Sequence, residues 1–338
     1  MKETFSSTAP QQTKKWDILK QPKFRLVKKI DDCFQKVKKL KKVLLAVNYN
    51  FPHYESATFI RNFYAPIFGE IMFCGDRSKP HINLHQAPLN SNNKGYQGYM
   101  CMQLAMQLHP NFDGYFYTND DVILNWWQVI NFDFRKIWLP APILPYEKKN
   151  HHIFGETHKT GWHWWRSVNA AKLCEEAFND TIKFSSTAKG KALGMDTYIR
   201  NYYSISKGLK VCFVTFSDAF YLPSQFRDAY IAISEIWGHK RVFLETAVPT
   251  MLSFFMNITA NNYEQLNGEA YNNRIGYSNE YLDGRAFYRF YNFNMTLIHP
   301  IKFGNSLMAK ANINFFNNVV KAYSNLFYDN CREKYCRY

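Results

Sequence analysis

Long apolar runs are missing from this sequence. No stretch of eighteen or more apolar residues occurs within its 338 residues, so no segment predicts a membrane-spanning helix. The segment from Met1 to Gln12 is polar and lacks the apolar centre of a signal peptide. We therefore expect a soluble protein, which is cytoplasmic as it stands and lumenal in the Golgi or endoplasmic reticulum if the natural protein also carries an anchor.

Acidic residues are scarce relative to basic ones. The chain has 27 Asp and Glu against 42 Lys and Arg, a formal charge of +15. Much of the excess lies in residues 14–42, ahead of the first clear strand. A basic arm of this kind is typical of a solvated helix face or of a tether to an anionic surface. We therefore expect no nucleic-acid partner, and an arm that could contact an anionic surface.

Paired cysteines are also missing. The seven cysteines are scattered, odd in number and without the spacing of a zinc site. This pattern predicts mostly reduced thiols. Cys331 and Cys336 are the only near neighbours, and a disulfide between them is left open.

Aromatic residues are abundant, at 18% of the chain, and they accompany strand and helix patterns. A continuous apolar run over 42–50 predicts a central parallel strand, 54–68 a helix, and 69–75 a second strand. This βαβ unit indicates an α/β fold with a mostly parallel central sheet flanked by helices. We find no repeat and no linker, so we expect one domain with insertions over 42–328, preceded and followed by shorter segments: a disordered start at 1–13, a basic helical arm at 14–41 and a tail at 329–338.

Two adjacent carboxylates end the next aromatic strand. Residues 112–118 predict a buried strand, and Asp120 and Asp121 follow it directly. Adjacent carboxylates beside an apolar core are costly unless a cation neutralises them, and oxygen ligands suit Mg²⁺ or Mn²⁺. Open α/β sheets bind ligands outside the carboxyl ends of their strands. The alternative is that the pair caps a helix beginning near Leu124.

Two other segments offer complementary groups. The first strand ends in Asn48 and Tyr49, which suit a base and ribose. Far downstream, His299 and Lys302 follow a short apolar run and offer an imidazole ligand and an ammonium for a diphosphate.

With these segments the sequence resembles the nucleotide-diphosphosugar glycosyltransferases of the GT-A fold, with some likeness to exostosin-like and virus-encoded soluble transferases. The resemblance spans roughly residues 42–302 and includes an Asp-X-Asp-type element, here Asn119-Asp120-Asp121, in which Asn replaces the first Asp. It implies that Asp121 is a metal ligand, that Asp120 contacts ribose or metal, and that the role of Asn119 is open. It further implies that His299 completes the metal shell and that Lys302 contacts the diphosphate.

Glu245 is the candidate general base, because it is an isolated carboxylate in an apolar stretch. It would deprotonate an acceptor hydroxyl and give inversion, or it serves only as a first-turn residue of a helix. Asp196 and Asp218 are rival bases, and either could be a helix cap.

Two further features could contribute to the site. Arg61 could face the phosphates or be a surface arginine. Trp162, Trp164 and Trp165 could form a sugar-stacking wall or pack in the core.

We therefore expect a metal-dependent glycosyltransferase that uses Mn²⁺ or Mg²⁺. Its donor is a nucleotide-diphosphosugar, with UDP favoured over GDP and UDP-xylose conceivable, and its acceptor is an oligosaccharide or glycoprotein glycan. The alternatives are a sugar-nucleotide nucleotidyltransferase, for which no glycine-rich basic loop follows the first strand, and a noncatalytic protein that binds glycan or nucleic acid.

Overall fold

The computed structural model describes residues 33–87, 96–140, 143, 151–153, 170–266, 268–270, 287–288, 291–304 and 309–335. The first half of the chain contains α1 Cys33–Leu40, β1 Val43–Asn48, η2 Tyr54–Ser56, α2 Ala57–Tyr64, β2 Glu70–Gly75, η3 Pro80–Ile82, β3 Leu84–Gln86, α3 Tyr99–Leu108, β4 Gly114–Asn119, β5 Ile123–Leu124, α4 Trp126–Val129, β6 Ile137–Leu139 and β7 His151–Ile153. The second half contains α6 Ala170–Ser185, α7 Ala188–Ala192, α8 Met195–Ile205, β8 Val211–Phe213, β9 Ala219–Pro223, η6 Ser224–Phe226, α9 Arg227–His239, α10 Leu244–Phe255, β10 Tyr263–Gln265, β11 Gly268–Ala270, β12 Leu297–His299, α13 Ala309–Phe315, the π-helical η7 Phe316–Lys321 and α14 Ala322–Tyr335.

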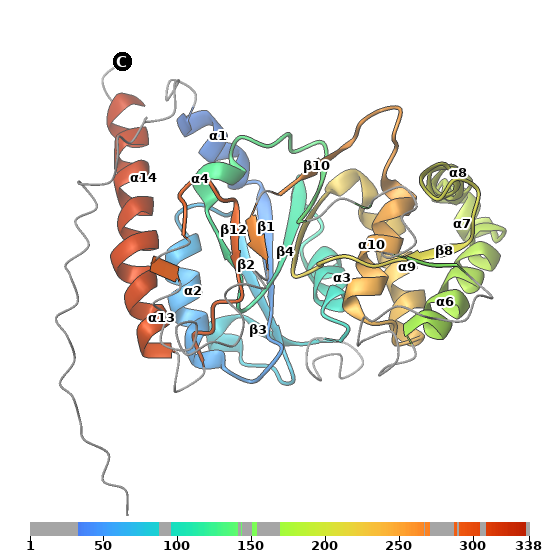
Figure 1. The fold of residues 1–338 in the computed structure, drawn as a ribbon, viewed down its shortest axis with the longest axis horizontal. Coiled ribbons are helices and arrows are strands. Elements are labelled where there is room, and N and C mark those ends of the chain that lie inside the picture. The colour runs from blue at the N-terminus through green and yellow to red at the C-terminus, as the bar shows by residue number, and fades with distance from the viewer. Residues whose placement is uncertain are drawn as a thin grey trace, which may run out of the picture.

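A seven-stranded sheet in the order β10-β6-β9-β4-β1-β2-β3 forms the centre of the molecule (Figure 1). Neighbours β4, β1, β2 and β3 run parallel, and β10 runs parallel to β6. Strand β9 runs antiparallel to both β4 and β6. The protein is thus a single mixed α/β domain with a mainly parallel central sheet flanked by helices, as the sequence predicted.

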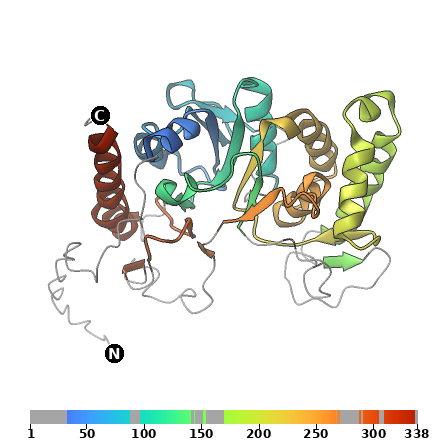
Figure 2. The same ribbon diagram turned by 90° about the horizontal axis from the view of Figure 1, so that it is seen from above.

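Both faces of the sheet are covered, which explains why β1 is apolar from Val43 to Val47, before its terminal Asn48. On one side Val43, Leu45 and Val47 join a core with residues of α1, α2, η7 and α14. On the other side Leu44 and Ala46 join a core with α3, α6, α9 and α10. Successive strand side chains point to opposite faces, so a strand buried on both has no polar positions. Figures 1 and 2 show the C-terminal helices at one end of the molecule and α6 at the other.

The helices also differ from the expectation in places. No helix begins at Leu124, because β5 occupies that position and α4 starts only at Trp126. The C-terminal helix α14 runs on to Tyr335, into the segment 329–338 that was expected to be a tail. Within the described part of the chain, no helix combines the length and apolar character that crossing a bilayer requires.

The expectation of mostly reduced thiols is wrong. The structure forms three disulfides, Cys33–Cys331, Cys74–Cys101 and Cys174–Cys212, with Cα atoms 5.7, 5.7 and 6.3 Å apart. The pairing of Cys331 with Cys33 also excludes a Cys331–Cys336 bridge. Partners lie 298, 27 and 38 residues apart in sequence, so only folding brings them together and their spacing carries no sign of it.

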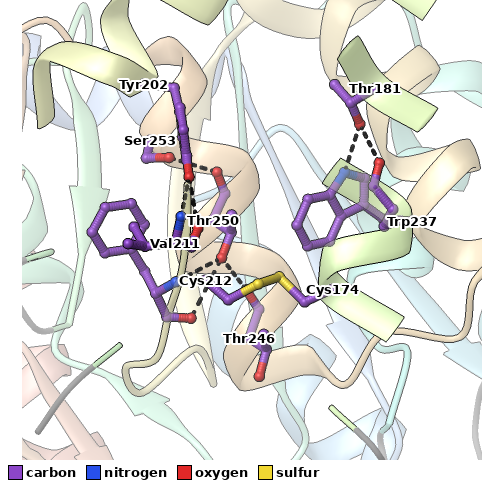
Figure 3. Close-up of a disulfide and its surroundings, with 11 residues drawn as sticks. Cys174, Thr181, Tyr202, Val211, Cys212, Trp237, Thr246, Thr250 and Ser253 are labelled. Atoms are coloured by element: carbon purple, nitrogen blue, oxygen red, sulfur yellow. Dashed lines mark hydrogen bonds between the residues drawn. A yellow bond between two sulfur atoms is a disulfide. The ribbon is translucent and has the colours of Figure 1, made fainter. Parts of the chain in front are cut away.

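The Cys174–Cys212 disulfide lies in a buried polar cluster between α6, β8 and α10 (Figure 3). The Thr250 hydroxyl accepts a hydrogen bond from the Phe213 amide at 3.0 Å and lies 2.8 Å from the Thr246 carbonyl, to which it donates. This threonine therefore links α10 to β8.

Candidate active site

Strands β1 and β4 end side by side, because their parallel register places Asn48 opposite Asn119. Beyond that point the Asp120 amide donates to the Asn48 carbonyl at 2.9 Å. The Asp120 carboxylate accepts a hydrogen bond from the Asn50 amide at 3.2 Å, and the Asn48 side chain donates to that of Asn50 at 3.0 Å. The carboxyl edge of the sheet therefore orients Asp120 through the loop that follows β1.

Asp121 is joined to the distant His299 segment by strand pairing. Strand β5 pairs antiparallel with β12, with Ile298 opposite Ile123, so His299 falls beside the turn that carries Asp121. His299 Nε2 lies 3.5 Å from Asp121 Oδ1, and the Lys302 ammonium contacts Asp121 Oδ2. The Ile301 amide also donates to the Asp121 carbonyl at 2.7 Å. Because Asp121 is followed by a strand, the helix-cap interpretation of the acidic pair does not hold.

Asp218 also enters this cluster, from the antiparallel strand. The pairing of Ala219 with Thr118 places Asp218 opposite Asn119, and the Asn119 side chain donates to Asp218 Oδ1 at 2.7 Å. The same Oδ1 atom lies 3.6 Å from His299 Nε2. We therefore define the acidic cluster as Asp120, Asp121, Asp218, His299 and Lys302.

Burial and nearby charges give the adjacent carboxyl groups of Asp120 and Asp121 different pKa values. Burial, and then the charge of Asp121, raise the pKa of Asp120 to about 7. Burial also acts on Asp121, but Lys302 and His299 outweigh it and hold the pKa of Asp121 below its usual value. At neutral pH Asp121 is therefore an anion.

The same charges act on the cationic members of the cluster. Burial disfavours the charged forms of His299 and Lys302, but the carboxylates prevail. Asp218 and Asp121 raise the pKa of His299, and Asp121 raises that of Lys302.

Glu245 lies in the first turn of α10 and is partly buried. Burial, and then the charge of Asp218, raise the pKa of Glu245 to about 8, while His299 acts in the opposite direction. These influences connect its carboxyl electrostatically to the acidic cluster. Pro249, inside the helix, cannot donate to the Glu245 carbonyl, which instead accepts a hydrogen bond from the Thr215 amide at 3.1 Å. The backbone of the candidate base is thus tied to the chain between β8 and β9.

Other candidates lie elsewhere. Asp196 is exposed in the first turn of α8, which lies far from β1 and β4 (Figure 1). Tyr49 is buried, and its hydroxyl is hydrogen-bonded to Ser56 at 2.8 Å. The structure therefore does not bring Asp196 to the cluster, and it turns the Tyr49 ring into the core.

Arg61 lies on α2 and makes contacts with the β2–β3 region. Its guanidinium donates to the Ile82 carbonyl at 2.6 Å and lies 5.2 Å from the centroid of the Phe73 ring. Trp162, Trp164 and Trp165 fall outside the described residues.

A hollow of about 400 Å³ lies beside the loop that follows β1. Its lining comes from that loop, the start of α2 and the segment between β2 and β3, namely Pro52, Tyr54, Glu55, Thr58, Lys79, His81 and Ile82. The Lys79 ammonium lies 5.1 Å from the centroid of the Tyr54 ring. Sequence reasoning missed this feature, because Lys79 approaches Tyr54 only through the pairing of β1 with β2.

The donor atoms of the acidic cluster suit a divalent ion. Within the described ranges, no three His, Cys, Asp or Glu side chains are already arranged around a metal position. Two buried carboxylate oxygens, Asp121 Oδ1 and Asp218 Oδ2, nevertheless have no hydrogen-bond partner among the described residues. Such oxygens cost free energy unless they are neutralised, and carboxylate with imidazole is a ligand set that Mn²⁺ accepts.

Comparison with protein families matches residues 11–189 to the STELLO glycosyltransferases. The match covers more than half of the chain and includes Asn48 and the Asn119-Asp120-Asp121 turn, but ends before Asp218, Glu245 and His299. Comparison with curated proteins finds no match. The extent of the family match shows that this chain belongs to the STELLO glycosyltransferase family, which indicates glycosyltransferase activity.

Proposed function

We propose that this family member transfers a sugar from a nucleotide-diphosphosugar to a hydroxyl group of a glycan acceptor. In this proposal the fold is of the GT-A type, the donor is a UDP-sugar, and Mn²⁺ or Mg²⁺ assists. The observation that carries the proposal is the convergence of Asp121 and Lys302, 181 residues apart, beside His299 at the carboxyl edge of the sheet. Paired charges of this kind can bind a metal diphosphate, since carboxylates attract the cation and the ammonium attracts phosphate oxygens.

The diphosphate would lie over the acidic cluster. Asp121 and His299 would hold the divalent ion, which supplies positive charge where the leaving diphosphate gains negative charge. Lys302 would contribute a second positive charge to the same phosphates. Its side chain is 36% exposed, so the ammonium can leave Asp121 for a phosphate oxygen without crossing the core.

The nucleoside would lie toward the hollow beside the loop after β1. The Asn50 amide already contacts Asp120, so this loop connects the acidic cluster with Pro52 and Tyr54 in the lining of the hollow. The Tyr54 ring is itself buried, and Lys79 beside it would contact a phosphate of the nucleotide. Asp120 would contact the ribose. Asn48 is fully buried and would act only through its hydrogen bond to the Asn50 side chain.

Glu245 would act as the general base. A raised carboxyl pKa, about 8, makes the deprotonated group a stronger proton acceptor than an ordinary glutamate. It would take the proton of the acceptor hydroxyl as that oxygen attacks the anomeric carbon, which gives inversion.

A donor screen tests the proposal. UDP-glucose, UDP-galactose, UDP-N-acetylglucosamine, UDP-xylose and GDP-mannose are each incubated with the protein and Mn²⁺, and release of nucleoside diphosphate is measured. We expect turnover of at least one donor and a loss of 100-fold or more, roughly, in Asp121→Ala. The control is Asp113→Ala, which removes an exposed carboxylate before the other end of β4. Equal turnover in both variants would refute the site, and exchange of pyrophosphate without sugar transfer would indicate a nucleotidyltransferase.

A further inference from the structure

Asn119 occupies the first position of the Asp-X-Asp-type element, where a carboxylate is usual. Both the oxygen and the nitrogen of its side-chain amide form hydrogen bonds. Its oxygen accepts a hydrogen bond from the Tyr117 hydroxyl at 2.7 Å. Its nitrogen donates to Asp218 Oδ1 at 2.7 Å. A carboxylate at position 119 has no hydrogen to donate and would face Asp218 as a like charge. Asn119 and Asp218 are therefore a matched pair, in which the amide allows the neighbouring group to be acidic.

The carboxylate of Asp218 points toward the same imidazole as Asp121. His299 Nε2 lies 3.5 Å from Asp121 Oδ1 and 3.6 Å from Asp218 Oδ1. Neighbouring ligand atoms around an ion with bonds of about 2.1 Å are roughly 3 to 3.5 Å apart, so small side-chain shifts would suffice. The Asp121 side chain is 3% exposed and its Oδ1 has no hydrogen-bond partner among the described residues.

Lys302 does not occupy this position. Its ammonium contacts Oδ2 of Asp121, the oxygen on the other branch of the carboxylate. The Oδ1 atom remains on the side of His299 and Asp218.

We propose that Asp218 is the third protein ligand of a divalent-cation site that it forms with Asp121 and His299. Strand β9 thereby supplies the carboxylate that position 119 lacks, and Asn119 acts as a positioning residue that holds Asp218 toward the ion. This inference rests on the proposed function and names the complete ligand set of the same site.

Binding of Mn²⁺ alone, without nucleotide, tests the inference. Calorimetry and the electron paramagnetic resonance of free Mn²⁺ give the affinity. Asp218→Asn keeps an oxygen that can accept the Asn119 hydrogen bond, so the local structure is retained. We expect this variant to bind Mn²⁺ about 100-fold more weakly than the unchanged chain. An affinity within about two-fold would overturn the inference, as would absence of Mn²⁺ binding by the unchanged chain.

A double variant, Asn119→Asp with Asp218→Asn, separates ligand position from total charge. It exchanges the two side chains and keeps both the charge and the capacity for the hydrogen bond between them. We expect Mn²⁺ binding to stay as weak as in Asp218→Asn, because the carboxylate is no longer beside His299. Restored affinity would show that only charge matters and would overturn the assignment. If the double variant does not fold, the single variant decides.

The role of Asn119 has its own readout. Asn119→Ala keeps the Asp218 carboxylate but releases it from its hydrogen bond. We expect weaker Mn²⁺ binding, about ten-fold, and faster relaxation of water protons by the bound ion as water replaces the carboxylate. A loss of thermal stability with unchanged affinity and relaxation would show a purely structural residue. Donor turnover without added metal, together with absent Mn²⁺ binding, would remove this inference and leave the proposed transfer standing.

Discussion

Replacement of Lys302 by methionine examines the charge balance of the acidic cluster without any ligand. Methionine keeps much of the aliphatic stem and removes the ammonium that contacts Asp121. The Asp121 side chain is 3% exposed and, among the residues that the structure describes, would retain His299, 3.5 Å away, as its cationic neighbour. Loss of one partner from a fully buried ion pair costs about 3 to 5 kcal/mol. Because the Lys302 side chain is 36% exposed, solvent screens the pair, and we expect a loss of about 2 kcal/mol.

The effect should depend on pH in a defined direction. The pKa of Asp121 is lowered in the folded protein, so its interactions stabilise the fold above the ordinary carboxyl pKa and are lost as the pH falls through the folded value. Lys302→Met removes part of that stabilisation. The free energies of unfolding of the two proteins should therefore differ most at pH 7, and this difference should shrink as the pH falls below the ordinary carboxyl pKa of about 4 toward the lower folded value.

Urea unfolding in the absence of metal measures this difference. The control is Lys321→Met, which removes an exposed lysine of η7 and should change the free energy of unfolding by less than about 0.5 kcal/mol. For a chain of this size, 2 kcal/mol corresponds to a melting temperature lowered by about 3 °C. Two results would refute the reasoning: equal stability of the Lys302 and Lys321 variants, or a difference that stays constant from pH 7 to pH 3.

Three other predictions follow from the same structure. Glu245→Gln should leave the donor dissociation constant, measured by calorimetry, unchanged and should lower the rate of sugar transfer about 100-fold or more. In the unchanged protein, the transfer rate should rise with pH up to about 8, where Glu245 loses its proton. A flat pH profile would exclude Glu245 as the base. The pKa of Asp120 is raised to about 7, so between about pH 4 and 7 the metal-free protein binds more protons when folded than when unfolded. Its free energy of unfolding, measured with urea, should therefore fall by about 2 kcal/mol as the pH rises through this window. Asp120→Asn should abolish that fall. Thr250→Val removes the acceptor for the Phe213 amide and should lower the free energy of unfolding by about 1 to 3 kcal/mol, while Mn²⁺ affinity stays unchanged; a shift in both would connect this cluster to the site.

Much of the fold was predictable because local patterns are consistent with it. The apolar run of β1 and the helix expected over 54–68 match β1 and α2 within a few residues, since a strand covered on both faces and an amphipathic helix leave clear patterns. Short elements were missed. Strand β5 consists of two residues, Ile123–Leu124, and no pattern can distinguish such a segment from the start of a helix.

The disulfides, in contrast, could not be predicted from the sequence. Cys33 and Cys331 are separated by 298 residues, and their pairing depends on α1 lying beside α14. Their scatter in the sequence says nothing about distance in the fold.

The candidate site was also predictable in part from the sequence. The sequence alone indicated Asp121, His299 and Lys302 as a group, because carboxylates at a strand end, an imidazole and an ammonium are chemically complementary. It left Asp218 as one of several candidate bases and the role of Asn119 open.

The sequence by itself thus predicted the central strands β1, β2 and β4, indicated the polar side chains at the ends of β1 and β4 as a candidate site, and carried the resemblance to glycosyltransferases. Only the tertiary structure decided which carboxylates meet. The antiparallel pairing of β9 with β4 brings Asp218 to Asn119, and the pairing of β12 with β5 brings His299 to Asp121. Strand register is a property of long-range contacts, and a shift of one residue would turn these side chains to the opposite face.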